Sequence, residues 1–408
     1  MKPQPYPYRA RAWWGEALVA ESDDCLVVDR PGESSLLYFP RADLDVSLFR
    51  QDGTTVSDPE ECDAESWSAE SAEGHRVLSI VTGAPAGLES LRDHGRFDTD
   101  RVRVEVLDGL SGTHPRDVTT KRFPTWGDTS HLVGMLDMRP QGNGRFVGPA
   151  RSDGRRPVVE GSQILGQAIV AAGRLAPGRR AVSSHMVFLR GADARQPLDF
   201  ELTELSSGRT FSALTVQVLQ TGRVCAAGTV LFDATSPEIL RHSVAPPDVP
   251  GPYDCPPYDM GVTGRDLRVV EGAYTDDADA PAGPPALDCW VRFRDLPHDP
   301  ALHAGLLTQF TGHMPIAAAL RPHPGVGQSQ AHRTVSMGIN AISLSLHAEV
   351  HADRWMLYHH ESTFAGDGMT HAVCRVHAED GALLASFDVD AMVRPFADGG
   401  ERDGRTAL

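Results

Sequence analysis

The sequence has no long apolar run and an excess of acidic residues. No stretch approaches the roughly 18 consecutive apolar residues of a membrane-spanning helix, and Met1–Trp14 has no signal-peptide core. Lysine and arginine number 38 against 55 aspartates and glutamates, a formal net charge of −17. This charge argues against nucleic acid and against an anionic membrane surface as partners. We therefore expect a cytoplasmic protein without a membrane partner.

The sequence also lacks the common metal and nucleotide motifs. Its six cysteines are widely spaced and form no Cys-x-x-Cys pair, which favours free thiols over a disulfide or zinc framework. No Gly-x-Ser-x-Gly elbow occurs, and no Gly-Lys-Ser/Thr follows a glycine-rich turn. His347 and His351 are four residues apart, but the alternation before them predicts a strand rather than a helical ligand pair. We expect neither a metal nor an organic cofactor.

The length of 408 residues exceeds what one compact core usually holds, so we expect two or three domains. Short strand-like runs punctuated by Gly, Pro and Asp predict a small, mainly β domain at the start, and Gly- and Pro-rich stretches predict linkers. The predicted divisions are a β domain at 1–112, a linker at 113–129, a first unit at 130–236, a linker at 237–286 and a second unit at 287–408.

The first unit contains a helix followed by strands. Ile164, Ala168 and Ala172, with Leu165 and Ile169 beside them, follow helical spacing and predict a buried stripe. Strand-like runs follow at 186–189, 200–205 and 211–219.

The second unit repeats this order, with a predicted helix at 300–320 and predicted strands at 342–350, 356–360, 371–377 and 383–393. The strand–turn–strand segments 208–233 and 366–390 parallel each other, which indicates a duplication. One helix wrapped by consecutive antiparallel strands is the layout of a hotdog domain.

Three segments of the first unit resemble the type II acyl-CoA thioesterases: Gly161–Ala168, His185–Arg190 and Ser207–Ser212. The resemblance implies an α+β fold, a tandem double hotdog, here preceded by the small β domain, which resembles a bacterial all-β family of uncharacterised function. It also implies an acyl-CoA or acyl-carrier-protein thioester as substrate. We expect a homo-oligomer, since the N-terminal domain adds surface for self-association.

The start of the first helix is the predicted carbonyl-binding end. Backbone N–H groups and the helix dipole there can stabilise the oxyanion that forms when a thioester is attacked. We expect Gly161, Ser162 and Gln163 to bind substrate there, together with His185 in the second matching segment. The alternative is a plain helix cap, with Ser162 as the N-cap residue.

The second unit departs from the family pattern. The resemblance implies an Asp, a Thr and a Gln that activate water, and these positions correspond to Ala341, Thr363 and Val389. Only Thr363 is retained. Asp388 and Asp390 flank Val389, but strand alternation directs both to the opposite face.

Two polar residues occupy positions where the family has apolar or aromatic ones. Glu160 precedes the first helix, and His313 is predicted within the second, as the counterpart of Gln163. We predict that Glu160, His313 and Thr363 are the catalytic residues, with burial raising the pKa of the Glu160 carboxyl. The alternative for Glu160 is a glutamate that only stabilises the helix dipole. The alternative for His313 is a histidine satisfied within the core.

Three functions remain open. The first is an acyl-thioester hydrolase with a rearranged catalytic set. The second is a non-hydrolytic enzyme on acyl thioesters, such as a hydratase or dehydratase. The third is an inactive acyl-thioester-binding module.

Overall fold

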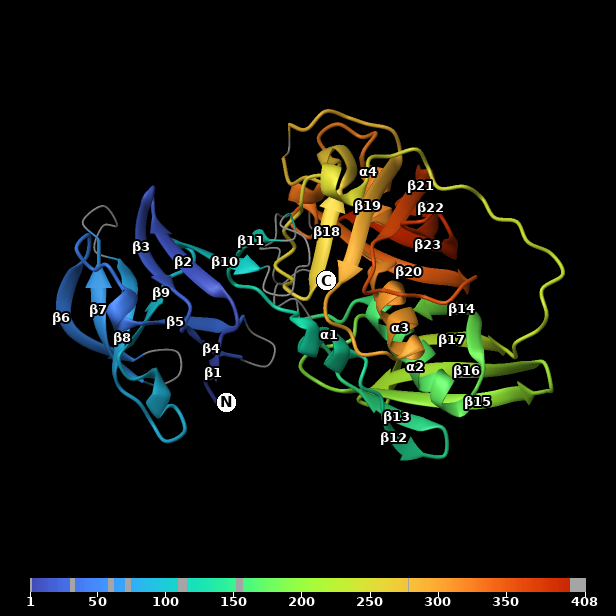
Figure 1. Cartoon of the computed structure of the whole chain (residues 1–408), viewed down its shortest axis with the longest axis horizontal. Coiled ribbons are helices and arrows are strands. Elements are labelled where there is room, and N and C mark those ends of the chain that lie inside the picture. Colours follow the sequence, from blue (N-terminus) through green and yellow to red (C-terminus); the bar gives the residue numbers. More distant parts are fainter. Residues whose placement is uncertain are drawn as a thin grey trace. The chain divides into compact units, whose positions relative to one another are not determined.

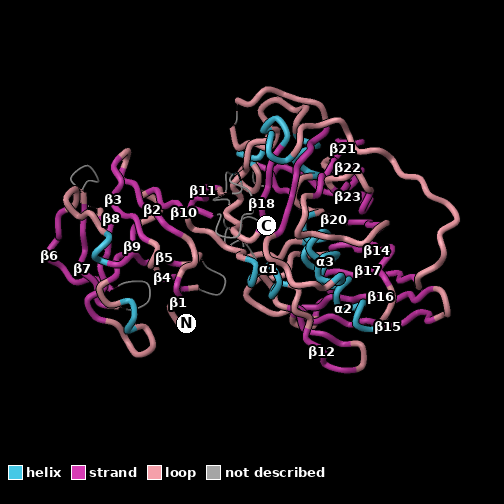
Figure 2. Tube along the Cα trace, viewed as in Figure 1, coloured by secondary structure: helices cyan, strands magenta, loops and turns pink. Residues whose placement is uncertain are grey.

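The computed structural model describes residues 2–29, 34–57, 62–69, 75–108, 116, 118–151, 157–277 and 279–396. The chain divides into two compact units, traced from the N-terminus to the C-terminus in Figures 1 and 2. The first unit comprises Met1–Gly127 and Asp259–Thr263, and the second comprises Asp128–Tyr258 and Gly264–Leu408.

The first unit is built from two antiparallel sheets, as its strand-like runs predict. One sheet has the order β1-β4-β5-β9-β8-β7-β6 and the other the order β11-β10-β2-β3. The strands are β1 (Gln4–Pro5), β2 (Arg9–Trp14), β3 (Ala17–Ser22), β4 (Leu26–Val28), β5 (Leu36–Pro40), β6 (Arg50–Ser57), β7 (Asp63–Ser68), β8 (Arg76–Gly83), β9 (His94–Phe97), β10 (Arg103–Asp108) and β11 (Thr119–Arg122).

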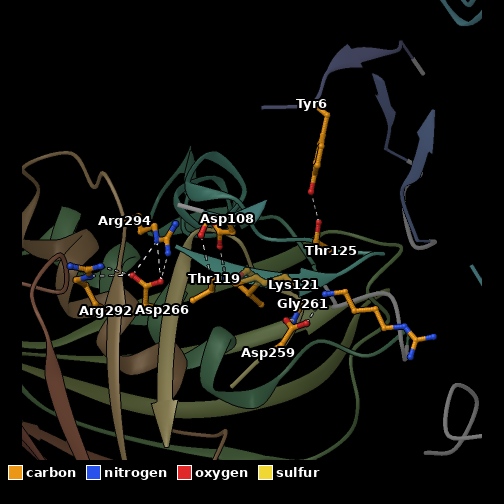
Figure 3. A network of polar contacts seen from close by, with 12 residues as sticks. Tyr6, Asp108, Thr119, Lys121, Thr125, Asp259, Gly261, Asp266, Arg292 and Arg294 are labelled. Carbon is orange, nitrogen blue, oxygen red and sulfur yellow. Dashed lines mark hydrogen bonds and ion pairs between the residues drawn. The ribbon is translucent and has the colours of Figure 1, made fainter. Parts of the chain in front are cut away.

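A buried ion pair joins the last two strands of this unit. Asp108 on β10 lies 2.6 Å from the Lys121 ammonium on β11, and both side chains are buried. Lys121, labelled in Figure 3, also donates a hydrogen bond to the carbonyl of Val262, which belongs to the returning segment Asp259–Thr263. The unit therefore continues beyond residue 112, and the predicted linker 113–129 contains strand β11 and the start of a helix; residues 113–115 and 117 lie outside the described part.

The second unit contains one continuous antiparallel sheet of twelve strands. Its order is β12-β13-β15-β16-β17-β14-β20-β23-β22-β21-β19-β18. The strands are β12 (Arg139–Gly142), β13 (Arg145–Gly148), β14 (Arg180–Phe188), β15 (Leu198–Ser207), β16 (Phe211–Gln220), β17 (Arg223–Asp233), β18 (Arg265–Val269), β19 (Ala286–Phe293), β20 (Val335–Leu346), β21 (Met356–Gly366), β22 (Met369–Ala378) and β23 (Leu383–Pro395).

The sheet consists of two halves that meet where β14 pairs with β20. The predicted duplication is confirmed, because β16 pairs with β17 in the first half as β22 pairs with β23 in the second. The strands are longer than the sequence predicts, and β20 begins seven residues before the predicted start at 342.

The helix of the first half, α2 (Gly161–Leu175), is a central helix as predicted, and it follows a short helix α1 (Thr129–Met135) (Figure 1). Ser162 through Ala172 are buried all round, not only along the predicted apolar stripe. A helix buried on every side requires a partner on the side away from the sheet. That partner is the helix of the second half.

The helix of the second half is divided in two, which corrects the prediction of one helix at 300–320. It consists of α3 (Pro300–Phe310) and α4 (Pro315–Leu320). The side chain of Asp299 caps α3 by accepting hydrogen bonds from the N–H groups of Ala301 and Leu302. Pro315 lacks an N–H and cannot continue the hydrogen bonds of α3, so the chain turns before α4 begins.

Helices α2 and α3 pack closely at two glycines. A Cβ atom on Gly166 would lie 2.6 Å from the carbonyl oxygen of Gly305, so only glycine allows this approach. The first turn of α2 also lies beside the end of α3, because a Cβ atom on Gly312 would lie 2.7 Å from the hydroxyl oxygen of Ser162. The two helices therefore run antiparallel, and their crossing brings the start of one next to the end of the other.

The six cysteines are buried and carry free thiols, as their spacing predicts. Within the described ranges, no helix has the length and hydropathy needed to span a membrane.

Gly166→Ala should destabilise the protein, because the added methyl group must push α2 away from α3. We expect the free energy of unfolding to fall by about 1–3 kcal/mol in urea denaturation. Gly173→Ala in the same helix is the control, since its Cβ would lie 3.8 Å from the ring of Phe232, an ordinary contact. That variant should keep or slightly raise the stability, and equal losses in both would contradict the close crossing.

The adjacent histidines of β21 should affect stability on opposite sides of pH 6.5, the ordinary pKa of histidine. Burial lowers the pKa of His360 to about 4, whereas the hydrogen bond that His359 donates to the Asp288 carboxylate raises the pKa of His359. Between about pH 6.5 and 4 the unfolded chain binds a proton at residue 360 that the folded chain cannot. Stability should therefore fall on acidification by up to about 1.4 kcal/mol per pH unit from this group.

Thermal unfolding across pH tests this expectation. His360→Gln should flatten the slope below pH 6.5, the ordinary pKa of histidine. His359 should stabilise the folded protein below pH 6.5, and this stabilisation should be lost as the pH rises through the raised pKa that His359 has in the folded protein. His359→Gln should therefore remove a pH dependence that lies above pH 6.5. Identical pH profiles for the two variants would refute the assignment.

Candidate functional site

The candidate site lies where the start of α2 meets the turn between α3 and α4. Glu160 is the N-cap residue of α2, but its side chain does not cap that helix. The carboxylate oxygen Oε2 instead accepts a hydrogen bond from Gln309 Nε2 at 3.4 Å and lies 3.5 Å from His313 Nε2. The two halves of the double unit thus each supply one member of a carboxylate–imidazole pair.

His313 belongs to the turn after α3, not to a helix as predicted, because the helix ends at Phe310. Its ring stacks on the ring of Phe310 with centroids 4.6 Å apart and planes 13° apart. The His313 side chain is only 6% exposed, whereas that of Glu160 is 45% exposed. The pair therefore has a buried imidazole and a carboxylate that solvent can reach.

A buried arginine completes this cluster. Arg265, the first residue of β18, places Nη1 3.3 Å from Gln309 Oε1 and 3.4 Å from His313 Nε2. Burial lowers the pKa of Arg265 to about 10, and the charge of Glu160 opposes that change. Arg265 is therefore a cation at neutral pH, and Glu160 is the negative charge that acts on it most strongly.

The sequence-based expectation is that burial beside a bound acyl chain raises the pKa of Glu160 toward neutrality, and this stays a prediction. In the protein without substrate the Glu160 side chain is 45% exposed, and its charge acts on the buried guanidinium of Arg265. An ionised Glu160 suits a base or a partner for an imidazolium better than a proton donor.

The three residues predicted at the start of α2 have different surroundings. Gly161 packs against the ring of Phe188, which a Cβ atom there would meet at 3.0 Å. Ser162 is the second helical residue rather than the N-cap, and it is fully buried beside Gly312. Gln163 is buried, and its side-chain amide approaches the carbonyl of Pro149 at 3.4 Å. Their roles in binding substrate stay a prediction.

His185 and Thr363 have polar partners outside the cluster of Glu160 and His313. His185 is exposed on β14, on the face opposite the buried Ser184 and Met186, with Nδ1 3.0 Å from the hydroxyl of Ser343. Thr363 is exposed at a bulge of β21, with its hydroxyl 2.7 Å from Nδ1 of His371. The functions predicted for both stay predictions.

The residues of β23 around position 389 alternate between the two faces of the sheet, as predicted. Val389 is buried, while Asp388 and Asp390 lie on the other face of β23. Asn340, next to Ala341, was not predicted as a site residue; it is the extra residue of a bulge in β20. Its Oδ1 atom is buried and has no hydrogen-bond partner among the residues that the structure describes.

Arg265 and Gln309 were also missed from the sequence. Arg265 lies in a segment predicted as linker, and the signal that could have revealed it is the alternation of charged and apolar residues directly after it, over 266–269. Gln309 and His313 are separated by four positions, which places them on one face if the helix continues. That spacing was a usable signal for their meeting.

The cluster can perform acid–base chemistry beside a helix start. The imidazole can exchange a proton, the carboxylate can stabilise the imidazolium, and the first N–H groups of α2 can stabilise an oxyanion. These are the functions that hydrolysis of a thioester by water requires.

Comparisons with known proteins point to acyl-CoA thioesterases. The family models of the acyl-CoA thioesterase N-terminal domain and C-terminal domain match residues 150–233 and 243–388. Acyl-coenzyme A thioesterase 8 of Homo sapiens is 27% identical over 261 residues, which cover 57% of this chain and 80% of that protein. Acyl-CoA thioesterase 2 of Haemophilus influenzae is 24% identical over 283 residues, which cover 65% and 97%.

Solved structures show the same fold. The acyl-CoA thioesterase II TesB2 from Mycobacterium marinum is 24% identical, has a TM-score of 0.56 and covers 65% of this chain and 99% of its own. A hot dog fold protein from Alicyclobacillus acidocaldarius has a TM-score of 0.52 at 17% identity over 64% of this chain and 97% of its own. The consecutive domain matches, the curated relatives and the tandem hotdog fold show that the chain belongs to the type II acyl-CoA thioesterase family.

Proposed function

We propose that the protein hydrolyses acyl-CoA thioesters and that Glu160 and His313 replace the water-activating groups absent at positions 341 and 389. The observation that supports this proposal is the 3.5 Å approach of Glu160 Oε2 to His313 Nε2 across the two halves. The resemblance implies apolar or aromatic side chains at both positions, so a carboxylate and an imidazole that meet here are not part of the family's usual set. A structural role alone would not require either polar group at this position.

The proposed reaction begins with a thioester carbonyl at the first turn of α2. His313 accepts a proton from water as the water oxygen bonds to the carbonyl carbon, and the carbonyl becomes an oxyanion that helix N–H groups stabilise. The ionised Glu160 stabilises the imidazolium. The oxyanion then re-forms the carbonyl as the carbon–sulfur bond breaks, and His313 returns the proton to the leaving thiolate. The products are a fatty acid and coenzyme A.

Incubation of the pure protein with saturated and enoyl-CoA thioesters tests the reaction. Release of free thiol, measured with a thiol reagent, is the expected outcome. A gain of about 18 mass units on an intact enoyl thioester, from the addition of one water, would mark a hydratase instead. Binding without either change would mark an inactive binding module, and both results would overturn the proposal.

Glu160→Gln and His313→Ala should each lower kcat by about tenfold or more, because general acid–base groups typically contribute about 10²–10⁴-fold. The affinity for acyl-CoA should stay within a few-fold, since neither group is needed for binding the acyl chain. Glu201→Gln is a matched control, because Glu201 has a similar side-chain exposure of 44% and forms an ion pair with the surface residue Arg145 at 3.4 Å. Full activity in both site variants would exclude this pair.

Thr363 is proposed as a third catalytic residue, on the resemblance alone. Thr363→Val keeps the volume but removes the hydroxyl that lies 2.7 Å from His371 Nδ1. If Thr363 positions the attacking water, kcat should fall by about tenfold, whereas Thr215→Val, another strand threonine, should leave it unchanged. Unchanged kinetics in both variants would remove Thr363 from the site and leave Glu160 and His313 as the acid–base groups.

A further inference from the structure

One nitrogen of His313 faces two groups with opposite requirements. Nε2 lies 3.4 Å from Arg265 Nη1 on one side and 3.5 Å from Glu160 Oε2 on the other. A guanidinium can only donate hydrogen bonds, and a carboxylate without a proton can only accept them. Nε2 can accept from Arg265 only when it has no proton, and it can donate to Glu160 only when it has one. The two contacts therefore belong to two protonation states of the ring.

We propose that Arg265 is a positioning residue that holds resting His313 as the neutral Nδ1–H tautomer, with the Nε2 lone pair ready to accept a proton. When Nε2 gains the proton of the attacking water, its hydrogen bond changes from Arg265 to Glu160. The proton returns to the leaving thiolate, and the contact with Arg265 forms again. This inference rests on the proposed function, but its first statement, the resting tautomer, concerns the protein without substrate.

Several contacts fix Arg265 in the required position. The backbone of Arg265 pairs with Phe293 on β19, and its guanidinium carbon lies 4.8 Å from the centre of the Phe310 ring. Nη1 also donates to Gln309 Oε1 at 3.3 Å. Because the Phe310 ring stacks on His313, one aromatic ring orients both the cation and the imidazole.

Besides His313, the titratable groups that act on Arg265 come from the start of α2, from β21 and from β19. Glu160 from the start of α2 provides the negative charge, while Tyr358 on β21 and Cys289 on β19 keep their protons because burial raises the pKa of each. The ordinary role of a buried arginine, pairing with a carboxylate for stability, does not require contact with the imidazole nitrogen. A test of the proposal must therefore report on the contact between Arg265 Nη1 and His313 Nε2.

Nitrogen NMR of protein labelled with ¹⁵N at histidine measures the tautomer directly. His313 is identified as the signal that disappears in His313→Ala. At neutral pH and without substrate, His313 should give the pattern of a neutral ring protonated on Nδ1. In Arg265→Gln the side chain ends two atoms short of the Nη1 position, so the donor to His313 is lost and the proton should move to Nε2, which then bonds to Glu160. Arg265→Lys has a longer side chain whose ammonium donates, and it should restore the Nδ1–H pattern.

Arg268 supplies a matched control on the same strand. It is buried, and its Nη1 donates to the carbonyl of Cys255 rather than to the site. Arg268→Gln should leave the His313 signal unchanged, and its kcat should stay near that of the unmodified protein. Arg265→Gln should lower kcat by about tenfold or more with KM within a few-fold.

The outcomes separate the inference from the proposed function. An Nε2–H ring in the unmodified protein would overturn the inference, even if Arg265→Gln failed to fold. An Nδ1–H ring that persists in Arg265→Gln would also overturn it. The expected tautomers with no thiol release from any acyl-CoA would retain the inference about Arg265 and refute the proposed function alone.

Discussion

The close crossing of α2 and α3 is the constraint on which the site depends. Gly166 and Gly305 let the two helix backbones approach until no side chain separates them. Because the helices run antiparallel, the start of α2 reaches the turn after α3, where Glu160 and His313 meet. Larger residues at the crossing would widen the gap between the halves, and a contact of 3.5 Å would not survive a displacement of that size.

The sequence predicts the parts of this fold that depend on local patterns. The helix over 161–175 follows from the spacing of its apolar residues, and the paired hairpins follow from alternation and a recurring turn. The division of the second helix was also readable, since Pro315 should end a helix, yet the apolar run 300–320 concealed it. His313 was consequently assigned to a helix rather than to a turn.

The approach of Glu160 to His313 could not be predicted, because it arises from packing between segments far apart in the chain. Arg265 was missed for a related reason. A charged residue in a proline-rich connection is expected to face solvent, and its burial becomes favourable only when Glu160, Gln309 and the ring of Phe310 surround it. Its neighbour Asp266 is buried in the same way between Arg292 and Arg294 (Figure 3).

Because the segment Asp259–Thr263 belongs to the first unit, this unit cannot form all its contacts until that segment has been synthesised. Lys121 can donate its hydrogen bond to the carbonyl of Val262 only after 141 further residues have been synthesised. At about 5–20 residues per second, the ribosome needs on the order of ten seconds for that stretch. During this interval the N-terminal unit has its strands but lacks one acceptor for a buried ammonium. The first unit to emerge is thus finished only after the first hotdog half has left the ribosome.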